Sequence, residues 1–277
     1  MLRKLFAQQT ILKRSYTTAP QSFQVFDRYA KRLQKDRAAS NAEESRTVDY
    51  LKDEIAARVA DRFLDIKRDL DTVVDLGSGC GHIAKHVTKD MMKKLIMCDM
   101  SVSVERLQVD EEALPFPENS IEAVVSSLSL NWVNDLPGSL IQIKNSLKPD
   151  GVFLGAMFGG DTLFELRTSL QLAEMERESG VSPRVSPMAD SSDMSRLLTR
   201  AGFSLPTVDV DEIQVNYPSM FELIEDLKAM GEKLHGNSDG SIPATFQIIY
   251  LIGWKPSENT PLAKKRGSAD ASLKDVL

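Results

Sequence analysis

The stretch Val73-Val74-Asp75-Leu76-Gly77-Ser78-Gly79-Cys80-Gly81 decides the fold of this chain. Its first part is a short β-branched run typical of a buried strand, and glycines follow at alternate positions. The dinucleotide fingerprint needs its third glycine one residue later, where this chain has His82, so the pattern is G-x-G-x-G. Glycine permits positive φ and lets a ligand approach the main chain closely. The stretch predicts a ligand-binding turn at the end of a strand.

A helix is expected directly after this turn, from about His82 to Asp90. Free N–H groups and the positive end of the helix dipole would then point at the ligand. A ligand carboxylate would be favoured at that place.

Two further acids end the next two predicted strands. Asp99 follows the strand expected over Lys94–Cys98, and Asp110 follows the strand expected over Glu105–Val109. An acid at the end of the second strand accepts hydrogen bonds from ribose hydroxyls in doubly wound sheets. Because parallel strands meet at one carboxyl edge, Asp75, Asp99 and Asp110 are expected to cluster there.

The rest of the chain alternates helices and strands, which predicts a doubly wound, mostly parallel α/β sheet covered on both faces. Further strands are expected over Ile121–Leu130, Val152–Met157, Thr207–Tyr217 and Pro243–Trp254. Further helices are expected over Gln24–Ser40, Thr47–Ile66, Leu136–Leu147, Asp161–Ser179, Asp190–Ala201 and Ser219–Leu234.

The composition excludes several classes of protein. Lys and Arg number 34 against 40 Asp and Glu, a net charge of −6 that argues against a nucleic-acid binder. No apolar run approaches the ~20 residues of a membrane span. Two cysteines cannot build a disulfide framework or a multi-Cys zinc site, which favours a reduced compartment.

The first 20 residues differ from the rest, because they are basic and hydroxylated and contain no acid. This composition is typical of a mitochondrial transit peptide, and Arg14-Ser15-Tyr16 resembles a matrix-processing site. A disordered N-terminus is the alternative. We therefore expect a transit peptide over 1–20, one domain over 21–256 with N-terminal helices at 24–66, and a flexible tail over 257–277.

Together these residues resemble class I S-adenosylmethionine (SAM)-dependent methyltransferases, with strand-Asp-Leu-Gly-x-Gly-x-Gly, strand-Asp and Asp-x-x-x-Leu-Pro-Phe in order. The resemblance implies a seven-stranded Rossmann-like sheet and SAM as the cofactor. It assigns Asp75 and the glycines to the methionine end, Asp99 to the ribose and Asp110 to the adenine amine. The cofactor-binding residues that it implies are Asp75, Gly77, Gly79, Gly81, Asp99, Asp110 and Glu111.

Four longer strings are similar to one family, the mitochondrial complex I assembly factors that act as arginine hydroxylases. The resemblance runs from about residue 26 to residue 269 and implies an enzyme of the matrix, peripheral to the inner membrane at most. Its implied partners are the PSST-type iron–sulfur subunit of complex I, whose arginine would be hydroxylated, and other assembly factors. The strings are Phe26-Asp27-Arg28 with Lys31-Arg32-x-Gln34-Lys35, Ser126–Pro137, Phe158–Arg167 and Asp211–Pro218.

Two alternatives to hydroxylation stay open. Bacterial relatives in this resemblance include malonyl-carrier-protein methyltransferases, so methyl transfer to a carboxylate or protein group is the first. The second is a non-catalytic assembly chaperone that keeps the fold. The sequence identifies no catalytic residue, oxidant or electron source.

Candidate substrate-facing residues follow the fourth and fifth strands, namely Asn131, Trp132, Phe158 and Asp161. Core packing is the alternative for Trp132, and a helix cap is the alternative for Asp161.

Two histidines are candidates for a metal site, and one cysteine is a candidate for a reactive thiol. The pair His82 and His86 has i, i+4 metal spacing but no carboxylate at a matching place, so no metal is predicted. Cys80 is either a reactive thiol or a small filler of the turn.

Two segments are shorter than the family pattern. Only ten residues separate Asp99 from Asp110, whereas a parallel crossover usually takes at least ~10–12 residues including a helix, beside the strand itself. The family's long helical stretch near residues 231–239 is also reduced. We expect weaker SAM binding than in a full-length relative.

Overall fold

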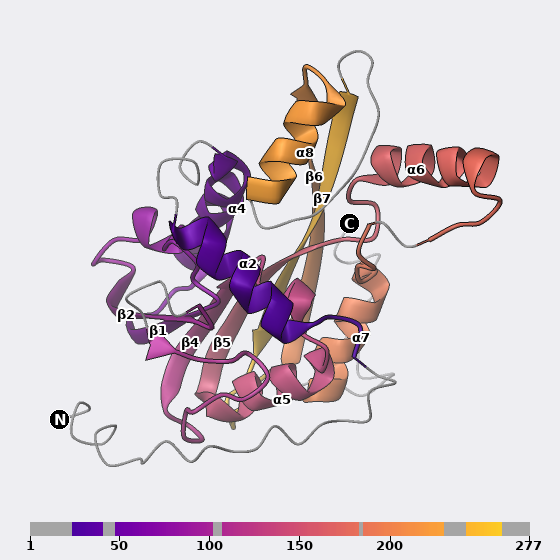
Figure 1. Cartoon of the computed structure of the whole chain (residues 1–277). Coiled ribbons are helices and arrows are strands. Elements are labelled where there is room, and N and C mark those ends of the chain that lie inside the picture. Colours follow the sequence, from indigo (N-terminus) through magenta and orange to yellow (C-terminus); the bar gives the residue numbers. More distant parts are fainter. Residues whose placement is uncertain (1–23, 41–47, 102–106, 183–184, 230–241, 262–277) are drawn as a thin grey trace, which may run out of the picture.

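The computed structural model describes residues 24–40, 48–101, 107–182, 185–229 and 242–261. These residues form a seven-stranded sheet of order β3-β2-β1-β4-β5-β7-β6 (Figure 1). β7 runs antiparallel to both neighbours, and the other pairs are parallel. The strands are β1 Leu70–Leu76, β2 Met92–Asp99, β3 Leu107–Gln108, β4 Ile121–Ser127, β5 Leu147–Phe158, β6 Ser204–Tyr217 and β7 Ile242–Trp254.

Helices confirm most of the expected periodicities. The α-helices are α2 Arg28–Ser40, α4 Tyr50–Asp61, α5 Leu136–Ser146, α6 Phe164–Arg177, α7 Ser191–Ala201 and α8 Met220–Ala229. Short 3-10 turns are η2 Arg62–Asp65, η3 Ile83–Lys85 and η4 Leu130–Trp132. The doubly wound, mostly parallel α/β fold is therefore confirmed.

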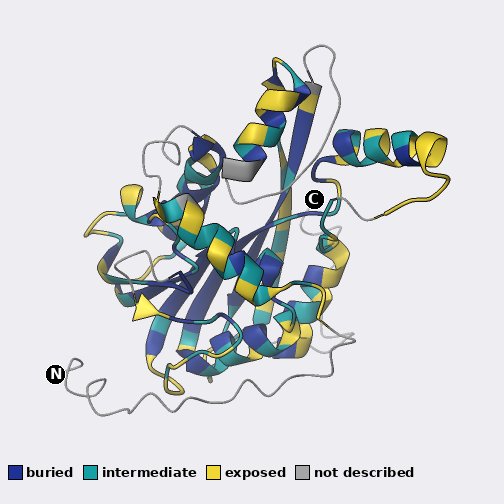
Figure 2. Cartoon of the chain, viewed as in Figure 1, coloured by how far each residue is buried: buried dark blue, intermediate teal, exposed yellow. Residues whose placement is uncertain are grey.

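Alternation along the central strands produces a separate apolar core on each face of the sheet. Val73 of β1 packs in one core with α4 and α8, whereas its neighbour Val74 packs in the other with α5 and α7. Successive side chains of a strand point to opposite faces, so an unbroken apolar run is what a doubly covered strand requires. The central strands β1, β4 and β5 are accordingly the buried layer between the helices (Figure 2).

Capping residues explain where α5 and α7 begin and where α7 ends. Asp135 accepts a hydrogen bond from the Gly138 N–H at the start of α5, and Asp190 accepts one from the Ser192 N–H at the start of α7. Gly202, with φ of 89°, ends α7 in the left-handed conformation that glycine adopts most easily.

The prediction of a helix from His82 to Asp90 is wrong. The structure has only η3 (Ile83–Lys85) there, followed by turns. Ile, His, Val and Thr are weak helix formers, and so short a segment needs tertiary packing to remain helical. His82 instead bonds to Asp53 of α4, so this segment closes onto α4.

The third strand is shorter than expected. β3 pairs with β2 through Leu107 and Gln108, while residues 105 and 106 of the predicted strand lie outside the described residues. In the described part of the β2–β3 connection, at Met100 and Ser101, there is no helix. The predicted transit peptide and most of the predicted tail also lie outside the described residues.

Candidate functional site

The glycine turn is pinned to the end of β2. The N–H groups of Gly77 and Ser78 both donate to the Cys98 carbonyl, at 2.8 and 2.9 Å. Gly77 has φ of +77°, and a Cβ there would lie 2.0 Å from Ser129 Oγ. Glycine is therefore required both by the backbone conformation and by the space.

The next glycine joins the turn to the acid at the end of β2. The Gly79 N–H donates to Asp99 Oδ2 at 2.9 Å, and the Ser101 N–H donates to the other carboxylate oxygen at 2.8 Å. Gly81 closes the turn, because its N–H donates to the Ser78 carbonyl at 2.8 Å. The turn and Asp99 thus form one rigid unit at the carboxyl edge.

Two cations of α2 pair with three acids at this edge. We name these five residues the acid–cation cluster: Arg28, Lys35, Asp99, Asp110 and Glu111. Arg28 Nη2 lies 2.7 Å from Asp110 Oδ1 and 2.5 Å from Glu111 Oε2. Lys35 Nζ lies 3.4 Å from Asp99 Oδ2 and 3.5 Å from Glu111 Oε1. The structure thus brings together Asp99 and Asp110, two of the three acids expected to cluster, with the cofactor-binding candidate Glu111, and helix α2 lies over them.

Glu111 is the centre of this cluster and is fully buried. Burial by itself would raise the pKa of its carboxyl group, but Lys35 and Arg28 and a hydrogen bond from Ser129 lower that pKa to about 2. Burial likewise opposes the charge of Lys35, and Glu111 and Asp99 outweigh it and raise the pKa of the ammonium. Both groups are therefore ionised at neutral pH.

Asp75 lies at the end of β1, with 1% of its surface exposed. Its charge acts on the buried thiol of Cys98. Burial, followed by the charges of Asp75, Asp99 and Glu111, raises the pKa of that thiol to about 12. Cys98 is therefore a protonated core residue and not a nucleophile.

A pocket of about 620 Å³ opens beside the cluster. Its walls include Phe26, Tyr29, Met100 and Asp110, so it lies next to the carboxyl ends of β2 and β3. This volume lies within the ~300–1,000 Å³ typical of small-molecule sites. Another pocket, of about 750 Å³, lies at the opposite edge of the sheet beside Asp69 and Met91, far from these acids.

Trp132, a candidate substrate contact, is buried. Its ring packs edge-on against Phe26 with centroids 5.4 Å apart, and Lys31 Nζ lies 3.2 Å from the ring centroid. This placement favours the core-packing alternative, in which the tryptophan seats the start of α2.

The other three candidates lie beyond β4 and β5. Asn131 Oδ1 accepts the Phe158 N–H at 3.1 Å and so ties the ends of the two strands. Phe158 is half-buried and its ring is 6.1 Å from that of Phe246. Asp161 is exposed and accepts a hydrogen bond from Gln247 Nε2 at 3.0 Å. Since α6 has no side-chain cap, the cap alternative for Asp161 is wrong.

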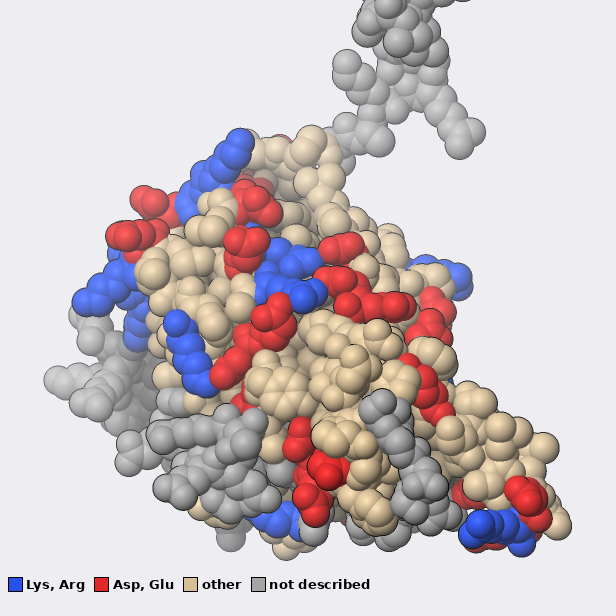
Figure 3. Space-filling model, turned by 90° about the horizontal axis from the view of Figure 1, so that it is seen from above, with Lys and Arg blue, Asp and Glu red and all other residues tan. Residues whose placement is uncertain are grey.

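Arg28 and Lys35 lie in one of the strings that resemble the family, but the sequence alone predicts no role for them. They are seven residues apart, about two helical turns, and so share one face of α2. That spacing, set against an acid-rich sheet edge, is the signal that could have found them. Across the face drawn in Figure 3, basic and acidic side chains are interspersed, without a uniform basic surface.

Comparisons with known proteins identify the fold. A family model described as a methyltransferase domain matches residues 48–208. A crystal structure from Bacillus halodurans, described as that of a methyltransferase, superposes with a TM-score of 0.54 at 14% identity, covering 72% of this chain and 99% of the other. The chain therefore has the fold of class I SAM-dependent methyltransferases.

A closer family emerges from curated relatives. The protein named arginine-hydroxylase NDUFAF5, mitochondrial, from Rattus norvegicus is 48% identical over 95% of this chain and 86% of its own length. This chain belongs to that family of arginine hydroxylases. A malonyl-[acyl-carrier protein] O-methyltransferase from Gallionella capsiferriformans is 28% identical over 88% of this chain.

The rat alignment also bears on the shortened segments. It spans 297 positions, more than the 277 residues of the whole chain. This chain therefore has deletions relative to the rat protein.

Proposed function

We propose that this chain is a SAM-binding arginine hydroxylase that acts on the PSST-type subunit of mitochondrial complex I and is required for assembly of that complex. The observation that carries the proposal is 48% identity to a named arginine hydroxylase over 95% of the chain. The carboxyl edge supports it, because the glycine turn and the Asp99 carboxylate meet there, where doubly wound sheets bind their ligands.

The residues present fit SAM. A Cβ on Gly79 would meet only one atom within 4 Å, at 3.9 Å, so the main chain there is open to approach. The pocket beside Asp110 has room for a nucleoside base. We infer that Asp75 and the glycine turn hold the methionine end, Asp99 the ribose and Asp110 the adenine amine.

One contact must change when the ribose binds. Lys35 Nζ lies 3.4 Å from the Asp99 oxygen that Gly79 also contacts. In our proposal Lys35 moves toward Glu111 and gives up Asp99 to the ribose hydroxyls. Glu111 thus holds α2 in place rather than binding the cofactor, and Arg28 remains on Asp110 and Glu111.

The surroundings of the target arginine are also proposed. An exposed carboxylate, Asp161, lies beyond β5 at the same edge, and a guanidinium pairs well with a carboxylate. The chain is mitochondrial, as its named relatives are. We place it on the matrix side, in contact with other assembly factors. No described helix has the length and apolar character needed to cross a membrane.

Mass spectrometry of the PSST-type subunit from cells with and without this protein tests the activity. We expect one arginine to gain a single oxygen only when the protein is present. A gain of one methyl group would support methyl transfer, which the malonyl-carrier-protein relative favours. A subunit that is unmodified in both kinds of cell, with assembly failing only in cells without the protein, would instead identify a chaperone. Either result overturns the hydroxylase.

A binding experiment tests the cofactor separately. Calorimetric titration of the full chain with SAM is expected to show one site, lost in Asp99→Ala. The matched control is Asp209→Ala, an exposed acid of β6 far along the sheet order from β2. Equal binding by wild type and Asp99→Ala would contradict the site.

A further inference from the structure

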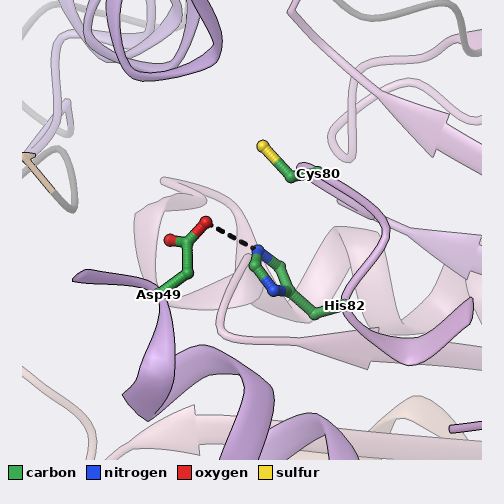
Figure 4. Close-up of side chains that lie close together, drawn as sticks. All are labelled: Asp49, Cys80 and His82. Atoms are coloured by element: carbon green, nitrogen blue, oxygen red, sulfur yellow. Dashed lines mark ion pairs between the residues drawn. The ribbon is translucent and has the colours of Figure 1, made fainter. Parts of the chain in front are cut away.

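Three side chains with different donor atoms lie close together beside the glycine turn (Figure 4). They are Asp49, which precedes α4, and Cys80 and His82, which belong to the turn. One ligand atom from each lies within 4.8 Å of the other two. Asp49 and His82 are buried, with 4% and 8% of their surface exposed, whereas Cys80 is exposed.

A second carboxylate orients the imidazole. Asp53 Oδ1 lies 2.6 Å from His82 Nδ1, and Lys85 Nζ bonds to both oxygens of Asp53. A carboxylate on one ring nitrogen fixes the N–H there and leaves the lone pair of the other nitrogen available. Metal-binding histidines commonly carry this carboxylate as an outer partner.

The other ring nitrogen of His82, Nε2, faces the carboxylate of Asp49. His82 Nε2 lies 3.6 Å from Asp49 Oδ2, while Lys52 Nζ lies 3.0 Å from the other oxygen, Oδ1. The lysine therefore occupies one carboxylate oxygen, and Oδ2 is directed toward the imidazole. Coordination by Asp49 would use this single oxygen.

We propose that Asp49 Oδ2, Cys80 Sγ and His82 Nε2 form a three-ligand site for a divalent transition-metal ion of the zinc type. Carboxylate, thiolate and imidazole are all ligands of Zn²⁺. At bond lengths of ~2.0–2.3 Å, donors in a tetrahedral site lie roughly 3.3–3.8 Å apart. The Asp49–His82 pair already has this spacing, and the exposed Cys80 side chain can rotate to close the remaining gap.

Three protein ligands leave a coordination position for water or another small ligand. This is the arrangement of catalytic rather than structural zinc sites. The site also lies directly beside the turn that contacts Asp99, since Cys80 follows Gly79 in the chain. The proposal goes beyond the hydroxylase function and does not depend on it.

The test uses the untagged full chain, kept reduced, and titrates it with Zn²⁺ and with Co²⁺ as a spectroscopic probe. We expect one equivalent to bind and the Co²⁺ complex to show a thiolate-to-metal absorption band. Cys80→Ser should abolish the band, and His82→Gln and Asp49→Asn should each weaken Zn²⁺ binding by at least tenfold. Asp53→Asn, which removes only the outer partner, should weaken binding ~10–100-fold.

The matched control is His86→Gln, because His86 is an exposed histidine four residues away on the same segment. It should bind Zn²⁺ like wild type. Circular dichroism of every variant checks the fold, and Cys80→Ser changes one exposed atom, so it should remain folded. Absence of the Co²⁺ band from wild type, or Zn²⁺ binding unchanged in Cys80→Ser, would overturn the site. Neither result affects the oxygen gain that tests hydroxylation.

Discussion

Two polar clusters at the glycine turn pair their carboxylates in different ways. In the acid–cation cluster, the acids are neutralised by full charges on Arg28 and Lys35. In the cluster beside Cys80, Asp49 and Asp53 pair with Lys52 and Lys85 and also share the buried imidazole of His82. Burial lowers the pKa of that imidazole against the pull of the two carboxylates. Ion pairs with Arg28 and Lys35 hold helix α2, whereas the second cluster places one imidazole between two carboxylates.

The largest effect in this comparison is expected from Glu111→Gln. Removing one partner of a buried ion pair leaves uncompensated charge, and we expect a loss of about 3 kcal/mol in the free energy of unfolding. Urea denaturation measures it. The control is Glu112→Gln, which removes a partly exposed carboxylate 3.8 Å from Arg28 and should cost less than ~1 kcal/mol. Similar losses in both variants would show that burial of the first pair carries no special weight.

The same carboxyl group predicts how stability depends on pH. The pKa of Glu111 is about 2 in the folded chain, against its ordinary value of 4.5. Because the folded pKa is the lower one, its stabilisation is complete above pH 4.5 and is lost as the pH falls toward 2. Urea unfolding at pH 6 and pH 3.5 should show a drop that is smaller in Glu111→Gln. An identical drop in the variant would assign the acid sensitivity to other groups.

Competition between Lys35 and the ribose is expected to have a medium effect. Lys35→Met frees Asp99, and SAM should bind roughly tenfold tighter, because a charge-assisted hydrogen bond contributes about 1.5 kcal/mol. The variant should also unfold more easily, since Glu111 loses a partner. Calorimetry measures the affinity, and Lys85→Met, a cation of the other cluster, is the control. Weaker SAM binding in Lys35→Met would mean that the lysine holds the cofactor.

The smallest expected difference concerns the shortened segments. With deletions relative to the rat protein, this chain should bind SAM several-fold more weakly, because only ten residues join Asp99 to Asp110 beside the pocket, fewer than a parallel crossover and its strand usually take. Parallel calorimetric titrations of the two proteins give the ratio. Equal dissociation constants would show that α2 and the pocket beside Asp110 replace what was lost.

Local patterns predicted most of the fold but not the helix after the glycine turn. Strand and helix positions followed from apolar spacing, since amphipathic periodicity reports which face is buried. The His82–Asp90 helix failed because a polar bond from His82 to Asp53, 29 residues away, outweighed the short helical pattern. The acids at the strand ends were predictable, because parallel strands share one carboxyl edge.

The sequence by itself determined the order of strands and helices, the glycine turn and the acids that end β2 and β3. These features depend on residues close together in the chain. Only the tertiary structure decided that Arg28 and Lys35 neutralise those acids, and that Asp49 meets Cys80 and His82. Such contacts join residues 31 to 83 positions apart in the chain. The periodicity of one segment does not give the orientation of a helix relative to a distant turn. Burial makes each of these pairings necessary for stability, since a charge removed from water is costly unless a partner lies close to it.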